Sequence, residues 1–387
     1  MTALDLIAGI GLAAWAYLIV ANGGFWLCSE REELEQGKYA EPKIWPRITA
    51  VIPARDEADM LPGSLTSLVK QDYPGEFSIV LVDDQSTDGT ADVARTIAAA
   101  SNRDVEIVRG APLPPRWTGK VWAMHQGIAA ASAVANPPDY LLLTDADIGY
   151  LPGVLKSLAV GASANHRAMT SVMAKLKCES LAERWLVPAF IFFFQMLYPF
   201  RRVNRPADCT AAAAGGCMLV ERAALERAGG IGAIRGALID DCALGKLLKT
   251  QGPIWLGLSD RVISLRAYET FGDIRRMVAR SAYAQLRYSP ILLAATVVAM
   301  AVIYIAPPVL AVSAASPANM LAAATYLLMF LAYQPTLRFY NRSPIWGFGL
   351  PLIAMAYVGF TLDSAYQHMR GRGGMWKGRV QAEVGRQ

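Results

Sequence analysis

Two aspartates, Asp145 and Asp147, stand one residue apart directly after an apolar run, Tyr140–Leu143. Two carboxylates at this spacing can share a divalent cation, which usually keeps waters and binds substrate phosphates. Asp-x-Asp alone is common in surface turns, so its context must decide. The apolar run predicts a buried strand, and open α/β sheets bind ligands where their strands end. We therefore expect a site for a cation and a phosphate at the end of this strand.

Carboxylates also follow two earlier apolar runs. Arg55–Glu57 comes just after Ile48–Pro53, and Asp83–Asp84 comes after Phe77–Val82. Each turn alone is better explained as a solvated loop, because Asp and Ser are common turn formers. Parallel strands end at the same edge of a sheet, however, so three such turns together indicate one shared site.

The elements that must position these turns alternate between strands and helices. We expect strands at Ile48–Pro53, Phe77–Val82, Val105–Val108 and Tyr140–Leu143, and helices at Met60–Gln71, Ala91–Ala100 and Val121–Ala135. Asp88 or Thr90 is expected to cap the second of these helices. The alternation predicts an α/β fold with a mainly parallel sheet and right-handed crossovers.

The composition separates an ordinary α/β middle from strongly apolar ends. Of the 387 residues 54% are hydrophobic and 18% are charged, and the net charge is +5. The basic residues cluster near the apolar segments, which favours anionic lipid or phosphate over nucleic acid as a partner. The five cysteines form no Cys-x-x-Cys pair and there are only three histidines. This usage argues against a thiolate or imidazole metal site and fits a reducing compartment without disulfides.

The first apolar segment, Leu6–Leu27, carries no charge. As a helix it would cover roughly 30 Å, enough to cross a bilayer. It lacks a basic region before it and a clean cleavage site after it, so we favour an uncleaved anchor over a signal peptide. Arg31 and Lys38 are the first basic residues after it, so the positive-inside rule predicts that the following domain is cytoplasmic.

Three further apolar segments, Ile291–Val312, Met320–Tyr333 and Trp346–Leu362, lie in the C-terminal third. Pro307–Pro308 is expected to kink or end the first of them, and the second is short for a span. Four spans would put the basic end of the chain on the non-cytoplasmic side, against the positive-inside rule. A re-entrant pair or an interfacial segment would resolve this conflict, and the sequence leaves the choice open.

Two segments have the composition of helices that lie at a membrane surface. Trp185–Phe200 is aromatic and contains two prolines, which favours an interfacial helix, with a buried core helix as the alternative. In Phe271–Tyr288 apolar residues recur at helical spacing among four arginines, as in a basic amphipathic helix. The expected organisation is an anchor at 1–28, a linker at 29–46, a cytoplasmic catalytic domain at 47–270 that includes 185–200, an amphipathic helix at 271–289, a transmembrane region at 290–368 and a basic tail at 369–387.

The motifs, taken in order, resemble the family 2 glycosyltransferases, which have the GT-A fold. "VIPARDE", "VDDQSTDGT", "GKVWAMHQG" and "TDAD" resemble the nucleotide-sugar-binding half, and "AAAAGGCMLV" and "IDDCALG" the acceptor-side glycines and the catalytic motif. They cover about Ile48–Leu265. "LPPRWTGK", "SVMAKLKCES", "FFFQMLYPF", "ALIDDCALG" and "DIRRMVARSAYAQLRYSP" are most similar to the hopanoid-biosynthesis-associated members. The resemblance implies a Rossmann-like, mainly parallel GT-A domain between N- and C-terminal transmembrane helices.

The resemblance also implies an inverting transfer, in which an acceptor hydroxyl displaces a nucleoside diphosphate from the anomeric carbon. Such a reaction needs a base and charge compensation on the leaving group. The matching base is Asp241, and Asp240 stands where the family often has Glu; a helix N-cap is the alternative role for Asp240. Asp147 is the implied direct ligand of Mg²⁺ or Mn²⁺, with Asp145 directed to the ribose or the same ion.

The implied donor pocket places Asp84 at the nucleobase, with Pro53, Arg55 and Glu57 lining the same pocket. The family usually has an aromatic or small polar residue where Arg55 stands. Lys120 is expected to contact phosphate through its ammonium group and the helix N-terminus, with a solvated turn as the alternative.

On the acceptor side, Gly215 and Gly216 are expected to let the backbone approach the sugar, with a plain tight turn as the alternative. Arg280 matches the arginine of the Gln/Arg-x-x-Arg-Trp motif of membrane-linked relatives, which contacts diphosphate. Ser281 replaces the tryptophan of that motif and Met277 its first residue. Contact with lipid headgroups would explain the arginine equally well.

The sequence thus predicts a multi-pass enzyme of the bacterial inner membrane, a hexosyl- or N-acetylhexosaminyltransferase. Its donor is expected to be a nucleotide sugar such as a UDP-sugar, and its acceptor a membrane lipid, first a hopanoid. Polyprenyl phosphate, ceramide and diacylglycerol are the alternative acceptors. A non-catalytic scaffold is disfavoured because Asp145, Asp147 and Asp241 are all present. A transporter is disfavoured because the apolar segments contain almost no charged residues to mark a pathway.

Overall fold

The computed structural model describes residues 2–376 and 379–380, and the chain forms two compact units. The α/β unit contains Glu30–Lys177 and Arg202–Ala267, and the helical unit contains Cys178–Arg201 and Tyr268–Gly374 together with the N-terminal segment up to Ser29. Cys178–Arg201 therefore belongs to the helical unit, although the sequence placed it inside the catalytic domain. Residues 377–378 and 381–387 of the expected basic tail lie outside the described residues.

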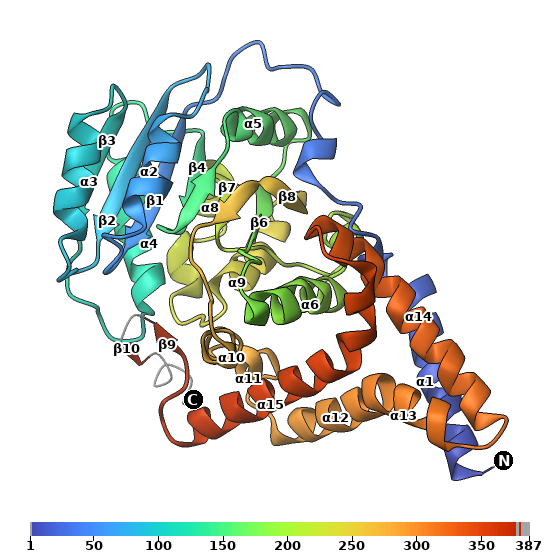
Figure 1. The fold of residues 1–387 in the computed structure, drawn as a ribbon. Coiled ribbons are helices and arrows are strands. Elements are labelled where there is room, and N and C mark those ends of the chain that lie inside the picture. The colour runs from blue at the N-terminus through green and yellow to red at the C-terminus, as the bar shows by residue number, and fades with distance from the viewer. Residues whose placement is uncertain (1, 377–378, 381–387) are drawn as a thin grey trace. The chain divides into compact units, whose positions relative to one another are not determined.

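An eight-stranded sheet in the order β3-β2-β1-β4-β7-β6-β8-β5 forms the centre of the α/β unit (Figure 1). Its strands are β1 (Ile48–Ala54), β2 (Phe77–Asp83), β3 (Asp104–Arg109), β4 (Tyr140–Thr144), β5 (Ile148–Tyr150), β6 (Met169–Lys175), β7 (Cys217–Glu221) and β8 (Ile254–Ser264). The first four strands are parallel, and so are β6 and β8. Strand β7 runs antiparallel to β4 and β6, and β5 runs antiparallel to β8. The predicted mainly parallel α/β fold is confirmed, with a mixed second half.

The helices of the α/β unit follow the strands closely. They are α2 (Leu61–Val69), α3 (Thr90–Ala99), α4 (Gly119–Ser132), α5 (Val154–Ala164), α8 (Arg222–Arg227) and α9 (Asp240–Lys249), with short 3-10 turns at Glu32–Leu34 and Ile231–Ile234. Helix α3 begins one residue earlier than expected, because Gly89 occupies the N-cap position with a φ of 88°. The Asp88 carboxylate still accepts a bond from the Thr90 backbone N–H at 3.0 Å, so it satisfies one free donor of the first turn.

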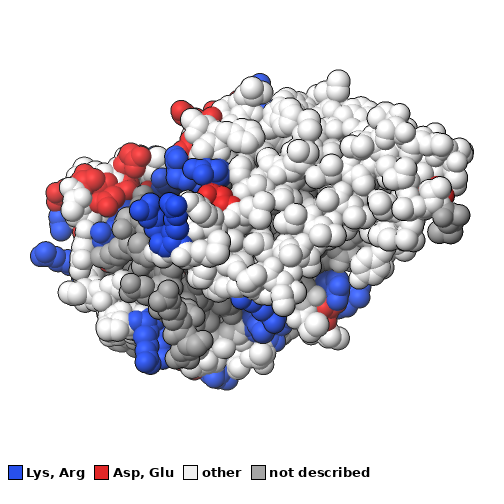
Figure 2. All heavy atoms as spheres, turned by 90° about the horizontal axis from the view of Figure 1, so that it is seen from below, with Lys and Arg blue, Asp and Glu red and all other residues white. Residues whose placement is uncertain are grey.

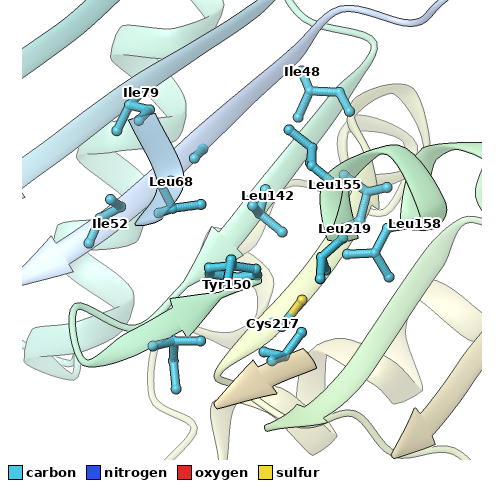
Figure 3. Packing of buried hydrophobic residues seen from close by; sticks show 14 of the residues in the cluster. Ile48, Ile52, Leu68, Ile79, Leu142, Tyr150, Leu155, Leu158, Cys217 and Leu219 are labelled. Carbon is cyan, nitrogen blue, oxygen red and sulfur yellow. The ribbon is translucent and has the colours of Figure 1, made fainter. Parts of the chain in front are cut away.

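The core of the α/β unit lies between the sheet and these helices (Figure 3). Ile52 on β1, Leu142 on β4 and Leu219 on β7 lie on one face with Leu68 of α2 and Leu155 of α5. All seven residues of β1 are buried, which explains their unbroken apolar character. Each fully buried Leu or Ile stabilises the fold by about 1.5–3 kcal/mol, so this core fixes the strand ends that carry the polar turns.

The helical unit contains long apolar helices. Its elements are α1 (Ala3–Val20), a 3-10 turn at Phe25–Leu27, α6 (Leu181–Leu197), α10 (Phe271–Ala279), α11 (Ala282–Gln285), α12 (Pro290–Met300), a π-helical turn at Ala301–Ile305, α13 (Ala306–Ser313), α14 (Ala318–Phe339), a 3-10 turn at Pro344–Gly349 and α15 (Leu350–Met369), while the short α7 (Phe200–Val203) starts in this unit. Within the described chain, four stretches are long and apolar enough to cross a membrane: Ala3–Val20, Pro290–Ser313, Ala318–Phe339 and Pro344–Met369. The face drawn in Figure 2 correspondingly includes a broad area without charged side chains.

Two expected boundaries in this unit differ from the observed ones. Helix α1 ends at Val20 rather than Leu27, and the following Gly23 and Gly24 have φ values of 62° and 64°, in the left-handed region that is common just after helix ends. Helix α14 extends to Phe339, so the segment that seemed short has 22 helical residues. Pro307 lies at the start of α13, directly after the π-helical turn Ala301–Ile305, so the regular α-helix is interrupted next to the prolines that were expected to kink or end it.

The two segments expected at a membrane surface also differ from expectation. Helix α6 starts with a capping box formed by Ser180 and Glu183 and buries side chains on most of its surface, as the core-helix alternative predicts. Residues 271–288 form two helices, α10 and α11, instead of one continuous amphipathic helix. Helix α10 buries Ile274 and Val278, while Arg275 pairs with Asp363 at 3.1 Å.

Candidate active site

The ends of β1 and β2 meet through Asp84 and Arg55. The Asp84 backbone N–H donates to the Ala54 carbonyl at 2.8 Å, and Arg55 Nη1 donates to the Asp84 carbonyl at 2.6 Å. The guanidinium also lies 3.8 Å from the Asp84 carboxylate, whose side chain is fully buried. Pro53 precedes this contact as part of β1. Arg55, whose role the sequence left in doubt, thus compensates the charge of Asp84 and holds its turn.

Lys120 connects two motifs that are far apart in the sequence. Its Nζ lies 2.7 Å from Asp145 Oδ1 and 3.3 Å from Asp240 Oδ2. The residue stands in the first turn of α4 rather than before the helix. Burial alone would lower the pKa of Lys120, but the charges of Asp145 and Asp240 raise it above its usual range. Lys120 is therefore a permanent cation between the Asp-x-Asp turn and α9.

Asp241 lies in the first turn of α9, held by two backbone donors. The Gly215 N–H donates to Asp241 Oδ2 at 3.0 Å and the Cys242 N–H to Oδ1 at 2.7 Å. Burial raises the pKa of Asp241 to about 6, and the charge of Asp240 acts in the same direction. A carboxylate with this pKa is ionised at neutral pH and is well matched to accept a proton.

Asp240 is the first helical residue of α9, and Ile239 occupies the N-cap position. The alternative role of Asp240 as the helix cap is therefore not observed, and its carboxylate is directed to Lys120 instead. Two acids at a helix N-terminus are favourably placed, because the helix dipole stabilises negative charge there.

The two glycines of the acceptor-side motif have different surroundings. A Cβ at Gly215 would lie 3.1 Å from Lys120 Nζ and 3.4 Å from Asp241 Oδ2, so the absence of a side chain lets both groups approach. A Cβ at Gly216 would instead lie 3.1 Å from Ile148 Cδ1, inside the packed core. Gly215 thus adjoins the carboxylates, whereas Gly216 serves the packing of β5.

Asp147 is paired with Arg266, a residue that the sequence analysis did not single out. Arg266 Nε donates to Asp147 Oδ2 at 2.7 Å, and Nη2 donates to the two carboxylate oxygens of Glu57 at 2.8 and 2.6 Å. The backbone N–H of Leu265 also donates to the Asp147 carbonyl at 2.8 Å. Arg266 follows the end of β8, as the predicted acids follow the ends of β1, β2 and β4. Its position just after a strand was the feature of the sequence that could have identified Arg266 as a site residue.

The Asp-x-Asp pair has a donor set that suits a divalent cation bound together with a diphosphate. Burial raises the pKa of Asp145, Lys120 opposes this, and the charge of Asp147 adds to it. Within the described part of the chain, no group of three or more His, Cys, Asp or Glu side chains is arranged to hold a metal. Mg²⁺ and Mn²⁺ sites with one or two carboxylates plus substrate phosphates need no such group. The residues present therefore fit a cation shared with substrate.

Arg280 belongs to the helical unit, where its backbone N–H caps α10 by donating to the Arg276 carbonyl at 3.1 Å. The other predicted site residues lie in the α/β unit. The assignment of Arg280 to a diphosphate stays a prediction.

A mixed, mainly parallel sheet with acidic turns at its strand ends and an acid pair at the start of α9 is the architecture of the GT-A glycosyltransferases. Comparison with known proteins agrees. Residues 49–229 match the family described as "Glycosyl transferase family 2". The chain is also similar to the solved structure of the mannosyltransferase PcManGT from Pyrobaculum calidifontis in complex with GDP-Man and Mn²⁺, with a TM-score of 0.57, 18% identity, and coverage of 93% of this chain and 99% of that chain.

A curated relative is the 4,4'-diaponeurosporenoate glycosyltransferase of Staphylococcus aureus (strain USA300), which is 32% identical over 104 residues. The match covers 27% of this chain and 24% of the relative, so the chain spans about a quarter of the length of the curated relatives that it matches. The similarity to family 2 glycosyltransferases thus extends over residues 49–229. The predicted fold is confirmed, the match agrees with the predicted family over residues 49–229, and the finer resemblance to hopanoid-associated members stays a prediction.

Proposed function

We propose that this chain is a membrane-bound inverting glycosyltransferase that moves a hexosyl or N-acetylhexosaminyl group from a nucleotide sugar to a hydroxyl of a membrane lipid. The observation that carries the proposal is the contact of Lys120 with both Asp145 and Asp240. It brings the turn suited to the donor diphosphate next to Asp241, a base with a pKa of about 6. Donor activation and proton removal can then occur in one site.

The donor side consists of the strand-end turns. Asp84 after β2, together with Pro53, Arg55 and Glu57 at the end of β1, is the proposed pocket for the nucleoside, with a UDP-sugar as the first candidate. Asp145 and Asp147 would hold Mg²⁺ or Mn²⁺; when bound, the cation would compensate the charge of the leaving diphosphate. The relative from Pyrobaculum calidifontis is named with GDP-Man and Mn²⁺, which supports this class of donor and cation.

The proton transfer is assigned to Asp241. As the acceptor oxygen bonds to the anomeric carbon, the bond from that carbon to the diphosphate oxygen breaks and the diphosphate takes the electron pair. The acceptor proton passes to the Asp241 carboxylate, which the N–H groups of Gly215 and Cys242 orient. Lys120 holds Asp145 and Asp240 in place and adds positive charge near the leaving group.

The acceptor is proposed from the helical unit and from the lipid-like acceptor in the name of the Staphylococcus aureus relative. Four membrane-capable stretches favour a multi-pass protein of the bacterial inner membrane, with the catalytic unit in the cytoplasm. A hopanoid hydroxyl is the first candidate, and polyprenyl phosphate, ceramide and diacylglycerol are the other members of the class.

The test is transfer by the purified full-length protein in detergent. We expect one nucleotide sugar from a panel to be consumed in the presence of Mn²⁺ and bacterial lipid extract, and mass spectrometry to identify the glycosylated lipid. The matched control is Asp241→Asn, which should leave the donor unconsumed. If the wild type consumes no donor under any condition, a non-catalytic scaffold replaces the proposed function.

A further inference from the structure

Arg266 is a cation of the candidate site to which the proposed transfer gives no role. Its guanidinium contacts Glu57 through two hydrogen bonds and Asp147 through one. The Glu57 and Asp147 side chains are 9% and 16% exposed, and the Arg266 side chain is 29% exposed. Arg266 therefore compensates the charge of both acids, while it retains access to solvent itself.

The geometry leaves Asp147 only partly engaged. Arg266 contacts Oδ2 of Asp147 with its Nε atom, whereas its Nη2 atom is directed to both oxygens of Glu57. Glu57 accepts two of these three charge-assisted hydrogen bonds, so Glu57 is the firmer anchor. Arg266 can lose Asp147 and still remain bound to Glu57.

Arg266 and a divalent cation would compete for the same carboxylate. Burial would lower the pKa of Arg266, but Asp147 and Glu57 raise it, so the guanidinium remains charged. A positive charge within about 4–6 Å lowers the affinity of a carboxylate for another cation by roughly tenfold or more. The same contact also fixes the orientation of Asp147 before any cation arrives.

Resting on the proposed function, we propose that Arg266 is a positioning residue that holds Asp147 in a counter-ion pair which Mg²⁺ or Mn²⁺ must displace or share. Glu57 keeps Arg266 at the site after this exchange. The affinity of the Asp-x-Asp turn for the cation then depends on whether the Arg266 guanidinium is bonded mainly to Glu57 or mainly to Asp147.

The two partners of Arg266 give variants with opposite expected signs. Arg266→Gln removes the competing charge, so Mn²⁺ should bind about tenfold more tightly. Glu57→Gln removes the anchor and leaves Arg266 to Asp147, so Mn²⁺ should bind several-fold more weakly. Arg95→Gln, which removes an exposed arginine paired with Asp92 on α3, is the matched control and should leave binding unchanged.

Mn²⁺ alone, without nucleotide, should be titrated into the full-length protein, with free Mn²⁺ followed by electron paramagnetic resonance. Weaker binding in both variants would mean that Arg266 only supports the fold and would overturn the proposal, as would an Arg266→Gln variant with unchanged affinity. If Arg266→Gln does not fold, Glu57→Gln decides by its sign. Sugar transfer by a wild type that binds no Mn²⁺ would overturn this proposal alone, whereas the expected signs without consumption of any nucleotide sugar would overturn only the proposed function.

Discussion

The two carboxylates of the Asp-x-Asp turn have different cationic partners, so the candidate site contains two separate ionic groups. Asp145 pairs with Lys120, which also contacts Asp240 beside the base. Asp147 pairs with Arg266, which is anchored on Glu57 in the donor turn. An ammonium group is a compact point charge, whereas a guanidinium is a rigid fork suited to two-bond pairing. Under the proposed function, the Lys120 group (Lys120, Asp145 and Asp240) would therefore link donor and acceptor chemistry. The Arg266 group (Arg266, Glu57 and Asp147) would control access of a cation to Asp147.

Loss of Lys120 should have the largest effect, because it leaves Asp145 and Asp240 facing each other without a cation. Removal of one partner from a buried ionic group costs about 3–5 kcal/mol. Asp145 is 35% exposed, so water offsets part of this, and we expect Lys120→Met to lower the free energy of unfolding by about 2 kcal/mol. Turnover should fall about a thousandfold.

Thermal unfolding and donor consumption would measure these two effects. Lys70→Met, at an exposed lysine of the same unit, is the control and should change neither. Retention of full turnover by Lys120→Met would show that the two motifs act independently.

The second effect concerns the base itself. Asp241→Asn should reduce turnover by about 10²–10⁴-fold with little change in donor affinity, because proton acceptance is lost and the donor turns are intact. The raised pKa also predicts a gain in stability. Asp241 has a pKa of about 6 in the folded protein against a usual value of 3.8, so its ionised form is disfavoured in the fold.

The stabilising proton of Asp241 is fully bound below 3.8 and lost as the pH rises through about 6. Asp241→Asn should therefore unfold at a higher temperature than the wild type at pH 7, and this difference should disappear in acid. An Asp241→Asn variant that is active and less stable than the wild type at pH 7 would contradict the assignment of Asp241 as the base.

A third effect separates the two ionic groups by pH. Wild-type turnover should fall about tenfold per pH unit below about 6, where Asp241 holds a proton, and should level off above that value. Lys120 lowers the pKa of Asp241, so in Lys120→Met the fall of the residual turnover at low pH should begin at a higher pH than in the wild type. Arg266→Gln should not change the pH at which turnover falls, because Arg266 pairs with Glu57 and Asp147 and not with the residues around Asp241. A shift of equal size in both variants would erase the distinction between the groups.

The sequence predicted the strand-end acids well, because apolar runs followed by Asp and Glu report local structure directly. The partners of those acids were less accessible. Lys120 was expected at a phosphate, and this stays a prediction. Its contacts with Asp145 and Asp240 were not predicted, because they depend on how β7 and the start of α9 are placed. Arg266 was missed for the same reason, since its pairing with Asp147 depends on where β8 joins the sheet.

The helical unit shows the complementary limit. Apolar length revealed its long helices, but not where they stop. Helix α14 passes through Pro335, whose missing backbone donor the surrounding helix tolerates, and the side-chain amide of the preceding Gln334 donates to the Phe330 carbonyl at 3.0 Å. Hydropathy falls there although the helix continues, so a pattern based on hydropathy alone ends the segment too early.

The smallest expected effects come from the two neighbouring glycines, which test how closely the Lys120 group is packed. Neither has a positive φ, so alanine is compatible with the backbone at both positions. Gly215→Ala would place a methyl group 3.1 Å from Lys120 Nζ and 3.4 Å from Asp241 Oδ2, and we expect turnover to fall about tenfold with nearly unchanged stability. Gly216→Ala would press on Ile148 in the core, and we expect a loss of about 1 kcal/mol in stability with turnover largely kept. Donor consumption and thermal unfolding of both variants would show whether the two effects separate, and a Gly215→Ala variant with wild-type turnover would mean that Lys120 and Asp241 can move apart without loss of function.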